Sequence, residues 1–526
     1  MTVSTPRARW LALTSIVAIA CLSGGWLLRA KPAAGGGVYQ QARLFENVVG
    51  AINHHYIDSL GEGDLYERAA EALVASLKDP YAELLINESY REYQRQMTGT
   101  EVDLDLGRGA TESGFGSGGH VGISRGDEIL SIDGTSTVGW STRRIEEALR
   151  NSRRSTVTVL VRAPGSDRPV VREITRTSVH VPAASPGVLL NGGVGYITLR
   201  RMSEGASDEL RTAVDRLRAE GMHALVLDLR SNPGGLIREG VKVASLFLEP
   251  GDTVAVSSGR TGKHLKAYLA GQSGDWKDLR LAVLVNRGTA SSAEVVAGAL
   301  QDHDRAVLVG TPTYGKGVLQ TTYPLGDEVA IKLTTARWYT PTGRWVQRPQ
   351  SESTGAPGNR TPAMEPQVFR TPMGRPIPDQ SGILPDLMVR TSFHSDGERT
   401  LHLALGDDLD RFRQVLGAYA AELRTDPAVS DESFVVTQAM RDTLYARLVG
   451  EGVPLARDTY DAAAPYVAEQ LGYEVTRELF GTESVVRRQA KGDRQLQAAL
   501  RIVRTAGNQQ EAITSAVAAQ ASGRAR

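Results

Sequence analysis

The residues of this 526-residue chain best suited to chemistry are a lysine between two glycines, Lys316, and a serine upstream of it, Ser291. From Gly310 to Lys316 the spacing of glycine and lysine is that of a Walker phosphate-binding loop. However, Gly317 stands where that loop needs a hydroxyl for magnesium, and a strand-like sequence follows instead of the helix whose amides would bind phosphate. A P-loop ATPase is therefore kept only as a remote alternative.

A serine nucleophile and a lysine base can together catalyse hydrolysis without a histidine. The segments 287–292 (RGTASS) and 311–317 (TPTYGKG) each follow a short apolar run that reads as a parallel strand. Because the carboxyl ends of parallel strands meet at one edge of a sheet, we expect Lys316 to lie beside Ser291. A neutral lysine amine can accept the serine proton, and burial in apolar surroundings favours the neutral form.

Acyl transfer also needs two backbone amides that bind the developing oxyanion. We expect one from Ser292, because it opens the helix predicted after Ser291 and the positive end of the helix dipole favours negative charge there. The second is expected from Gly234 or Gly235 in the NPGG segment, where glycine lets the backbone approach a substrate closely.

Each of these residues also has a purely structural interpretation. Ser291 and Glu294 have the spacing of a helix capping box, NPGG can be an ordinary turn, and a lysine between glycines is commonly a solvated charge. A conventional triad built on His303 fails on distance, because this residue lies at the far end of the serine's own helix, about 18 Å away at 1.5 Å per residue.

The amino-acid composition limits the kinds of partner and ligand that we expect for this chain. Lys plus Arg and Asp plus Glu each number 60, and no long basic run occurs, so nucleic acid is not an expected partner. Cys21 is the single cysteine, which excludes a disulfide framework and a thiolate zinc cluster. The nine histidines lack metal-ligand spacing, so no metal site is expected.

The N-terminus predicts a protein that works outside the cytoplasm. Arg7 and Arg9 precede an uncharged stretch, residues 10–28, that is nearly long enough to cross a bilayer as a helix with its N-terminus inside. No clean A-x-A cleavage site follows, so an uncleaved anchor is expected, with a cleaved signal as an alternative. The AIAC segment ending at Cys21 loosely resembles a lipobox, which leaves a lipoprotein as a further alternative.

Sequence periodicity predicts a mixed α/β protein in several parts. An N-terminal anchor or signal and linker is followed by a helical domain, a β-rich module with one amphipathic helix, a core whose βαβ order implies largely parallel strands, and a helical C-terminal extension. The expected boundaries are 1–37, 38–98, 99–182, 183–395 and 396–526.

Taken together, the motifs of this chain resemble those of the carboxyl-terminal processing, or tail-specific, serine proteases, a family with a PDZ-like domain. The resemblance runs from residue 44 to residue 389. It is carried by LFENVVGAINHHYID, DPYAELL, RGDEILSIDG, GYITLRR, LVLDLRSNPGGL, VNRGTASSAEVVAGALQD, GTPTYGKGVLQ, YTPTGRWVQ and GILPDLMV.

This resemblance implies that Ser291 is the nucleophile, Lys316 the general base and Gln320 the residue that orients the lysine, and that Asp302 is structural. On a regular strand Lys316 and Gln320 would lie about 13 Å apart, so the chain must bend or the side chains must lean together. The resemblance further implies a vault-like protease core, no metal or cofactor, and action on the C-terminal tails of unfolded or processed proteins on the periplasmic side of a bacterial cell envelope.

The chain also departs from the family pattern. Glu101, Asp103 and Asp105 stand where a glycine-rich apolar loop commonly binds a terminal carboxylate, so we expect a degenerate PDZ-like domain whose binding of C-termini is open. Ser292 and Ala293 exchange the usual order, and the helical tail after residue 395 is a candidate for a homodimer or adaptor contact. A non-catalytic envelope scaffold that binds partners through this domain is the second function class.

Overall fold

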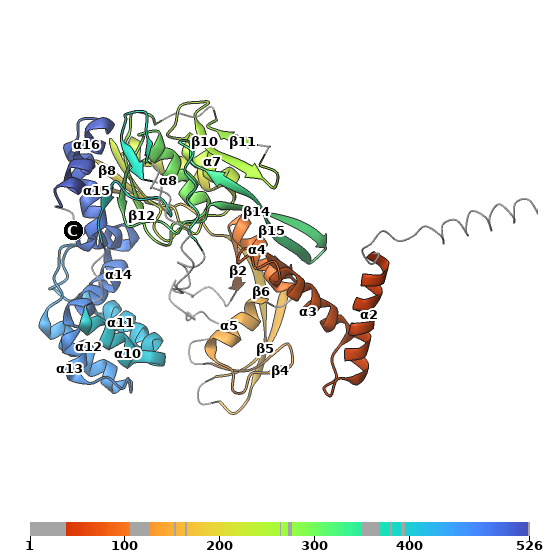
Figure 1. Cartoon of the computed structure of the whole chain (residues 1–526). Helices are drawn as coiled ribbons and strands as arrows, with labels where there is room; N and C mark the ends of the chain where they lie inside the picture. The colour runs from red at the N-terminus through yellow and green to blue at the C-terminus, as the bar shows by residue number, and fades with distance from the viewer. Residues whose placement is uncertain are drawn as a thin grey trace, which may run out of the picture. The chain divides into compact units, whose positions relative to one another are not determined.

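The computed structural model describes most of the chain after residue 37 (Figure 1). The described residues divide into two compact units at Leu84. The described ranges are 38–105, 127–151, 154–163, 166–262, 265–271, 276–349, 368–378, 381–390 and 395–523. The predicted anchor, residues 10–28, lies outside them. No helix within these ranges has the length and hydrophobicity needed to span a membrane.

The first unit contains two helices, α2 (Val38–His55) and α3 (Glu62–Ala75). They bring Phe45 and Tyr66 together, with ring centroids 6.1 Å apart. The third helix of the predicted helical domain, α4 (Glu88–Thr98), belongs to the second unit, where Gly99 ends it in a left-handed conformation.

The β-rich module folds as an antiparallel sheet with strand order β2-β6-β5-β3-β4 and one helix, α5 (Thr142–Asn151). Its small core contains Ile132, Leu149, Val157 and Ile174. The acidic residues expected in a binding loop lie instead on β2, which pairs with β6. The segment that follows, residues 106–126, is outside the described residues. The strands are β2 (Thr100–Asp105), β3 (Glu128–Ile132), β4 (Thr135–Ser136), β5 (Thr156–Arg162) and β6 (Val170–His180).

A six-stranded sheet forms the centre of the predicted core, with order β18-β13-β12-β9-β8-β7. All neighbours are parallel except β7 and β8, which confirms the largely parallel sheet expected from the sequence. In register, Asp228 at the end of β9 is paired with Leu284 of β12, and Val285 is paired with Gly310 of β13. The loops that follow these strands therefore start at one edge. The strands are β7 (Val188–Leu190), β8 (Val194–Thr198), β9 (Ala224–Asp228), β12 (Arg280–Val285), β13 (Val307–Gly310) and β18 (Leu387–Met388).

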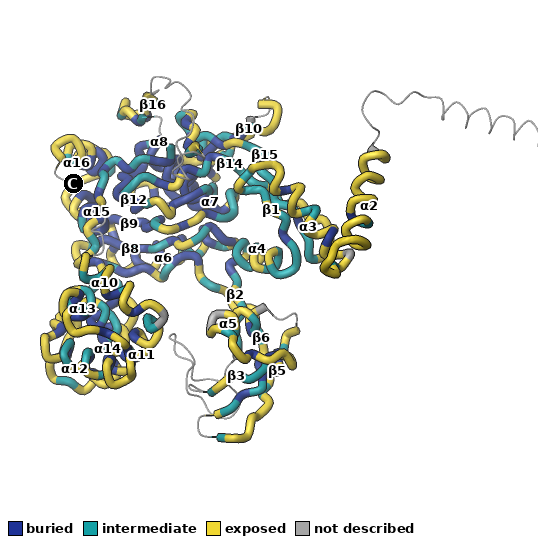
Figure 2. The backbone as a smooth tube through the Cα atoms, turned by 60° about the horizontal axis from the view of Figure 1, so that its bottom comes forward, coloured by how far each residue is buried: buried dark blue, intermediate teal, exposed yellow. Residues whose placement is uncertain are grey.

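Helices cover both faces of this sheet, which explains why its strands are apolar throughout rather than alternating (Figure 2). Leu225 and Leu227 of β9 face α6 (Ala206–Ala219), α7 (Ile237–Ser245) and α8 (Ser292–Asp302). Ala224 and Val226 face the other way, toward α15 (Arg494–Thr505) and α16 (Gln509–Ala521).

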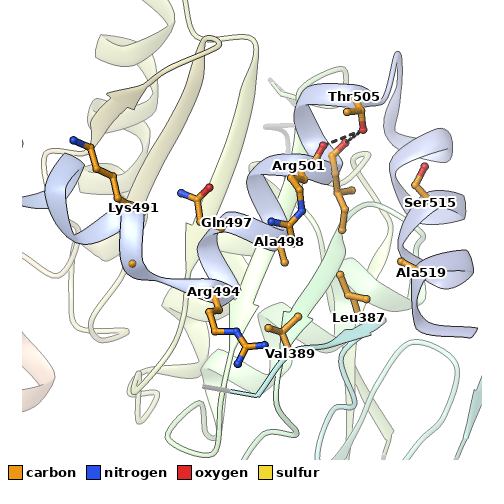
Figure 3. Close-up of a pocket in the computed structure, with 12 residues that line it drawn as sticks. Leu387, Val389, Lys491, Arg494, Gln497, Ala498, Arg501, Thr505, Ser515 and Ala519 are labelled. Carbon is orange, nitrogen blue, oxygen red and sulfur yellow. Dashed lines mark hydrogen bonds between the residues drawn. The ribbon is translucent and has the colours of Figure 1, made fainter. Parts of the chain in front are cut away.

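The last two helices of the expected C-terminal extension thus share the hydrophobic core of the protease sheet. Near the sheet edge, Ala498 of α15 and Ala519 of α16 line one cavity of about 470 Å³ with Leu387 and Val389 (Figure 3). Gln520 caps the edge, because its Oε1 accepts a hydrogen bond from the amide of Met388 over 2.9 Å.

The rest of the extension has a hydrophobic core of its own, which includes Leu416, Leu444, Tyr460 and Leu471. It is built from α10 (Asp396–Leu405), α11 (Leu409–Glu422), α12 (Gln438–Gly450), α13 (Arg457–Ala462) and α14 (Ala464–Gly492). Helix α14 is broken at Gly481, whose φ is 79°, and its second half leads directly into α15.

A second, antiparallel sheet contains the strands after the YGKG segment. β14 and β15 form a long hairpin, as the strand-like sequence predicts, and β15 pairs with β10. The strands of this sheet are β1 (Glu83–Ile86), β10 (Thr253–Gly259), β11 (Leu265–Leu269), β14 (Val318–Gly326) and β15 (Val329–Tyr339). Two short strands, β16 (Val368–Arg370) and β17 (Pro376–Pro378), form a separate two-stranded antiparallel sheet.

Candidate active site

Ser291 stands at the turn between β12 and α8, as the N-cap residue of that helix. Its φ of 55° and ψ of −122° are unusual for a residue with a side chain, and such conformations cost about 1–3 kcal/mol. A strained strand-to-helix turn of this kind holds a nucleophile at the end of a sheet with its hydroxyl presented to a substrate. The helix behind it is buried over its whole length.

The strained turn is held by polar side chains that the sequence analysis did not single out. Oδ1 of Asn286 accepts hydrogen bonds from the amides of Ser231 (2.8 Å) and Gly288 (2.9 Å). The hydroxyl of Thr289 donates to the carbonyl of Leu229 over 2.7 Å. The loops after β9 and β12 are therefore tied to each other, and the asparagine before the GTAS segment was the signal available in the sequence.

The NPGG loop lies directly against the nucleophile. A Cβ placed on Gly234, whose φ is 90°, would lie 2.7 Å from the carbonyl oxygen of Ala290 and 2.9 Å from Cβ of Ser291. Only glycine fits this position, for both its conformation and its contacts. The expected convergence of the NPGG loop and the serine is thus present.

The two candidate glycines differ in what their amides do. The amide of Gly234 donates to Oδ1 of Asn232 over 2.9 Å. In the part of the chain that the structure describes, the amides of Gly235 and Ser292 have no protein acceptor. Gly235 and Ser292 are therefore the pair available to an oxyanion, while the amide of Gly234 maintains the loop.

One buried carboxylate joins the serine and the lysine segments. Oε2 of Glu294 accepts from the amides of Ser291 (2.8 Å) and Lys316 (2.9 Å), and Oε1 accepts from the hydroxyl of Thr313 (2.6 Å) and the amide of Gly315 (2.7 Å). The side chain is 0% exposed. Burial raises the pKa of Glu294, and these four hydrogen bonds oppose that rise because they favour the charged form.

This carboxylate reconciles the structural interpretation of Ser291 with the catalytic one. Glu294 does bind the N-cap residue, as the S-x-x-E spacing predicts, but the same oxygen also fixes the lysine loop. Capping and site assembly are therefore one arrangement rather than alternatives.

The backbone around Lys316 is enclosed by the end of β15 and the segment that follows it. The carbonyl of Lys316 accepts from Nε1 of Trp338 over 2.8 Å, and the carbonyl of Gly317 accepts from Nε1 of Trp345 over 3.0 Å. A Cβ on Gly317 would lie 2.8 Å from that same Nε1 atom, and a Cβ on Gly315 would lie 3.0 Å from the carbonyl oxygen of Val346. The glycines on both sides of the lysine are explained by these close approaches.

The same contacts leave no phosphate cradle. The amides of Gly315 and Lys316 bind the Glu294 carboxylate, and that of Gly317 donates to Oε1 of Gln347 over 2.9 Å. The Glu294 side chain already occupies the position where a phosphate would have to bind, and β14 follows instead of a helix. The Walker-like spacing is therefore coincidental.

Gln320 lies on β14, with its Nε2 donating to Oγ1 of Thr334 over 3.3 Å. Lys316 precedes this strand, which starts at Val318, and the pairing of β14 with β15 shifts register between Leu319 and Gln320. The chain is thus bent between the two residues, as their expected interaction requires. The orienting role of Gln320 stays a prediction.

Asp302 and His303 lie at the opposite end of α8 from Ser291. Asp302 is buried and forms an ion pair with Arg344, while Nε2 of His303 lies 2.7 Å from the carbonyl oxygen of Thr253. Among the described residues, no group of histidine, cysteine or acidic side chains could hold a metal ion.

Comparison with known proteins finds two segments of this chain that match family models. Residues 193–354 match the peptidase family S41, and residues 111–162 match the PDZ domain. The first match spans every predicted site residue. The PDZ-like module expected from the sequence is confirmed.

The chain is also similar to curated proteins. A "Probable CtpA-like serine protease" of Staphylococcus aureus (strain bovine RF122 / ET3-1) is 33% identical over 318 residues, which are 58% of this chain and 63% of the relative. A protein of the same name from Staphylococcus haemolyticus (strain JCSC1435) is 28% identical over 313 residues, 58% of this chain and 62% of the relative. The chain thus spans less than two thirds of the length of these curated relatives. The resemblance to carboxyl-terminal processing serine proteases is confirmed.

Among solved structures, the chain is similar to a "photosystem II D1 C-terminal processing protease". The identity is 28% and the TM-score 0.33, over 57% of this chain and 88% of that one.

Proposed function

We propose that this chain is a serine endopeptidase in which Ser291 is the nucleophile and Lys316 the general base. The observation that carries the proposal is the shared anchoring of the two residues, whose backbone amides bind one oxygen of buried Glu294. A serine in a strained strand-to-helix turn and a lysine fixed to the same carboxylate are the parts of a catalytic pair.

In this mechanism the Ser291 hydroxyl attacks the scissile carbonyl carbon while the neutral amine of Lys316 takes the hydroxyl proton. The amides of Gly235 and Ser292 bind the oxyanion of the tetrahedral intermediate. When the intermediate collapses, the leaving amine takes the proton back from Lys316. A water molecule, activated by the same amine, then hydrolyses the ester on Ser291. Gln320 orients the lysine.

The proposed substrates are unfolded or processed proteins cut from or near their C-terminal tails. The names of the relatives and the PDZ match support a protein or peptide substrate. We place the enzyme on the periplasmic side of a bacterial envelope, attached by residues 10–28 or as a lipoprotein. A homodimer or adaptor contact through α10–α14 is part of the same proposal.

The test is incubation of the full-length chain with an unfolded protein that ends in an apolar tail. Cleavage should depend on both Ser291 and Lys316, and Lys316→Arg should be as inactive as Lys316→Ala, because a guanidinium cannot become a neutral base. Turnover that survives in the arginine variant would refute the mechanism. A non-catalytic scaffold predicts instead that Ser291→Ala keeps full function in the cell.

A further inference from the structure

Arg230 connects the oxyanion loop to the C-terminal helices. It directly precedes the loop 231–235, which contains both glycines of the candidate site. We propose that Asp493 and Gln495, at the junction of α14 and α15, are positioning residues that hold this loop in its active conformation through Arg230. The inference rests on the proposed protease function and extends it to residues about 260 positions away in the sequence.

The guanidinium of Arg230 binds groups from two separate parts of the chain. On the side of the sheet, Nε donates to both carboxylate oxygens of Asp228 over 3.0 Å, and Nη2 to Oδ2 of that residue over 2.6 Å. On the side of the C-terminal helices, Nη2 lies 2.7 Å from Oδ2 of Asp493, and Nη1 donates to Oε1 of Gln495 over 3.1 Å. A rigid fork with bonds to three partners fixes the orientation of its own backbone.

The partners of Arg230 are themselves held in place. Oδ1 of Asp493 accepts the amide of Leu496 over 3.0 Å and so caps α15. Gln495 is 0% exposed, and its Nε2 donates to the carbonyl of Val389 over 2.7 Å. The hydroxyl of Tyr196 donates to Oδ2 of Asp228 over 2.7 Å. These three partners, here called the Arg230 clamp, are Asp228, Asp493 and Gln495. They are anchored in the sheet, in the residue that follows β18 and in α15.

The backbone conformation of the loop 231–235 explains why it needs support from Arg230. Ser231 has a φ of 56° and Gly234 a φ of 90°, so the backbone leaves the strand in conformations that are uncommon for an unsupported turn. The amide of Arg230 also donates to Oδ1 of Asp228 over 2.9 Å, which fixes the point where the loop begins. A shift of the Arg230 side chain would be passed to Gly235, five residues further on, whose amide must face the oxyanion.

The charges around Arg230 also support a positioning role for Asp493. The Arg230 side chain is only 18% exposed, and it has two carboxylates within hydrogen-bond distance. Burial lowers the pKa of Arg230, but the bonds to Asp228 and Asp493 outweigh this and raise it. Without Asp493 the cation would keep one acid partner, and its fork would be free to turn toward water.

Two substitutions separate this role from helix capping. Asp493→Asn keeps an N-cap oxygen but places an amide donor opposite Nη2 of Arg230, and Asp493→Ser keeps a cap but is too short to reach the guanidinium. Asn508→Ala is the matched control, because it removes the cap of α16, where Oδ1 of Asn508 accepts from the amide of Glu511 over 2.9 Å, and touches no residue of the clamp.

The experiment measures kcat and KM of the full-length chain for an unfolded protein substrate, together with thermal unfolding. Loss of one oxyanion donor lowers kcat by about 10²–10³, so a displaced donor should cost about tenfold. We expect this fall in kcat for both Asp493 variants and for Gln495→Met, with KM nearly unchanged. Asn508→Ala should lose thermal stability but keep kcat.

The result that overturns the inference is an active wild-type chain whose Asp493→Asn variant folds and retains the wild-type kcat, or loses only affinity. An equal fall of kcat in Asn508→Ala would also overturn it, because general loosening would then explain the effect. If Asp493→Ser fails to fold, the kcat of Asp493→Asn alone tests the inference. A wild-type chain that cleaves nothing would refute the proposed function instead, so the two failures are distinguishable.

Discussion

The backbone amides of Ser291 and Lys316 donate to the same oxygen, Oε2 of Glu294, over 2.8 and 2.9 Å. The two segments follow different strands of the parallel sheet. This carboxylate fixes one relative to the other, together with a hydrogen bond from the amide of Tyr314 to the carbonyl of Thr289 over 2.9 Å. The site therefore depends on a residue that is expected to make no contact with substrate.

The first prediction concerns Glu294→Gln. The amide nitrogen of glutamine would face two of the four donors that the carboxylate now accepts, leaving them buried and unsatisfied. At about 1–3 kcal/mol for each such group, the free energy of unfolding should fall by about 3 kcal/mol, and turnover by more than tenfold. Urea unfolding and steady-state cleavage measure both.

Glu239→Gln is the control for that variant. Glu239 is similarly buried, at 1% exposure, and binds Ser207 of α6 and Lys242 of its own helix, α7. Its replacement should lower stability and leave turnover near the wild-type level. Equal losses of turnover in the two variants would argue against a special role for Glu294.

The second prediction concerns pH. Burial raises the pKa of Glu294 above its ordinary value of 4.5, so the folded protein holds this proton more tightly than the unfolded chain. Its contribution to the free energy of unfolding is therefore largest at low pH and is lost as pH rises through the raised pKa. Activity should change in the opposite direction, because the four donors require the ionised carboxylate, and should fall on acidification with a midpoint above 4.5.

Unfolding and turnover followed across pH check this opposition. The Glu294→Gln variant should lack the corresponding slope in stability, whereas Glu239→Gln should keep it. Superimposable stability profiles for the wild type and Glu294→Gln would show that the carboxyl does not titrate in this range.

The third prediction concerns the side chain of Ser292. Its hydroxyl is buried and has no hydrogen-bond partner among the described residues. An unsatisfied buried hydroxyl destabilises the folded state, so Ser292→Ala should raise the free energy of unfolding by about 1 kcal/mol. Ser245→Ala should lower it, because the buried hydroxyl of Ser245 donates to the carbonyl of Val241 over 2.7 Å. A loss of stability in both variants would contradict the expectation.

The fourth prediction concerns Gly234→Ala. The added Cβ would collide with Ala290 and Ser291, so cleavage should fall by at least about 10²-fold, as for loss of an oxyanion donor. Gly251→Ala separates this collision from conformational cost, because Gly251 has nearly the same φ, 93°, with nothing within 4 Å of the added carbon. Both should lose about 1–2 kcal/mol of stability from the left-handed conformation, but Gly251→Ala should retain activity in a peptide-cleavage assay.

The sequence predicts the parallel sheet and the meeting of the Ser291 and Lys316 segments, because apolar runs and strand ends follow from local periodicity. It does not decide between Gly234 and Gly235, since that choice depends on where the side chain of Asn232 points. The sequence identifies Glu294 only as a helix-capping residue. Its bonds to Gly315 and Lys316 could not be predicted, because those residues follow another strand. Gln320 comes from family resemblance alone.

The packing of α15 and α16 against the parallel sheet also could not be predicted from the sequence. An amphipathic pattern shows that a helix buries one face, but not against which partner. After residue 395, the helices of the separate core and the two that cover the sheet all bury apolar side chains, but against different partners.

This placement of α15 and α16 has a consequence for biosynthesis. The helices α15 and α16 are synthesised after the serine, the lysine and the glycine loop, so a chain cut before residue 494 would leave one apolar face of the sheet without the helices that cover it. We expect such a truncated chain to aggregate and to lack cleavage activity, although it would still carry Ser291, Lys316 and the NPGG loop.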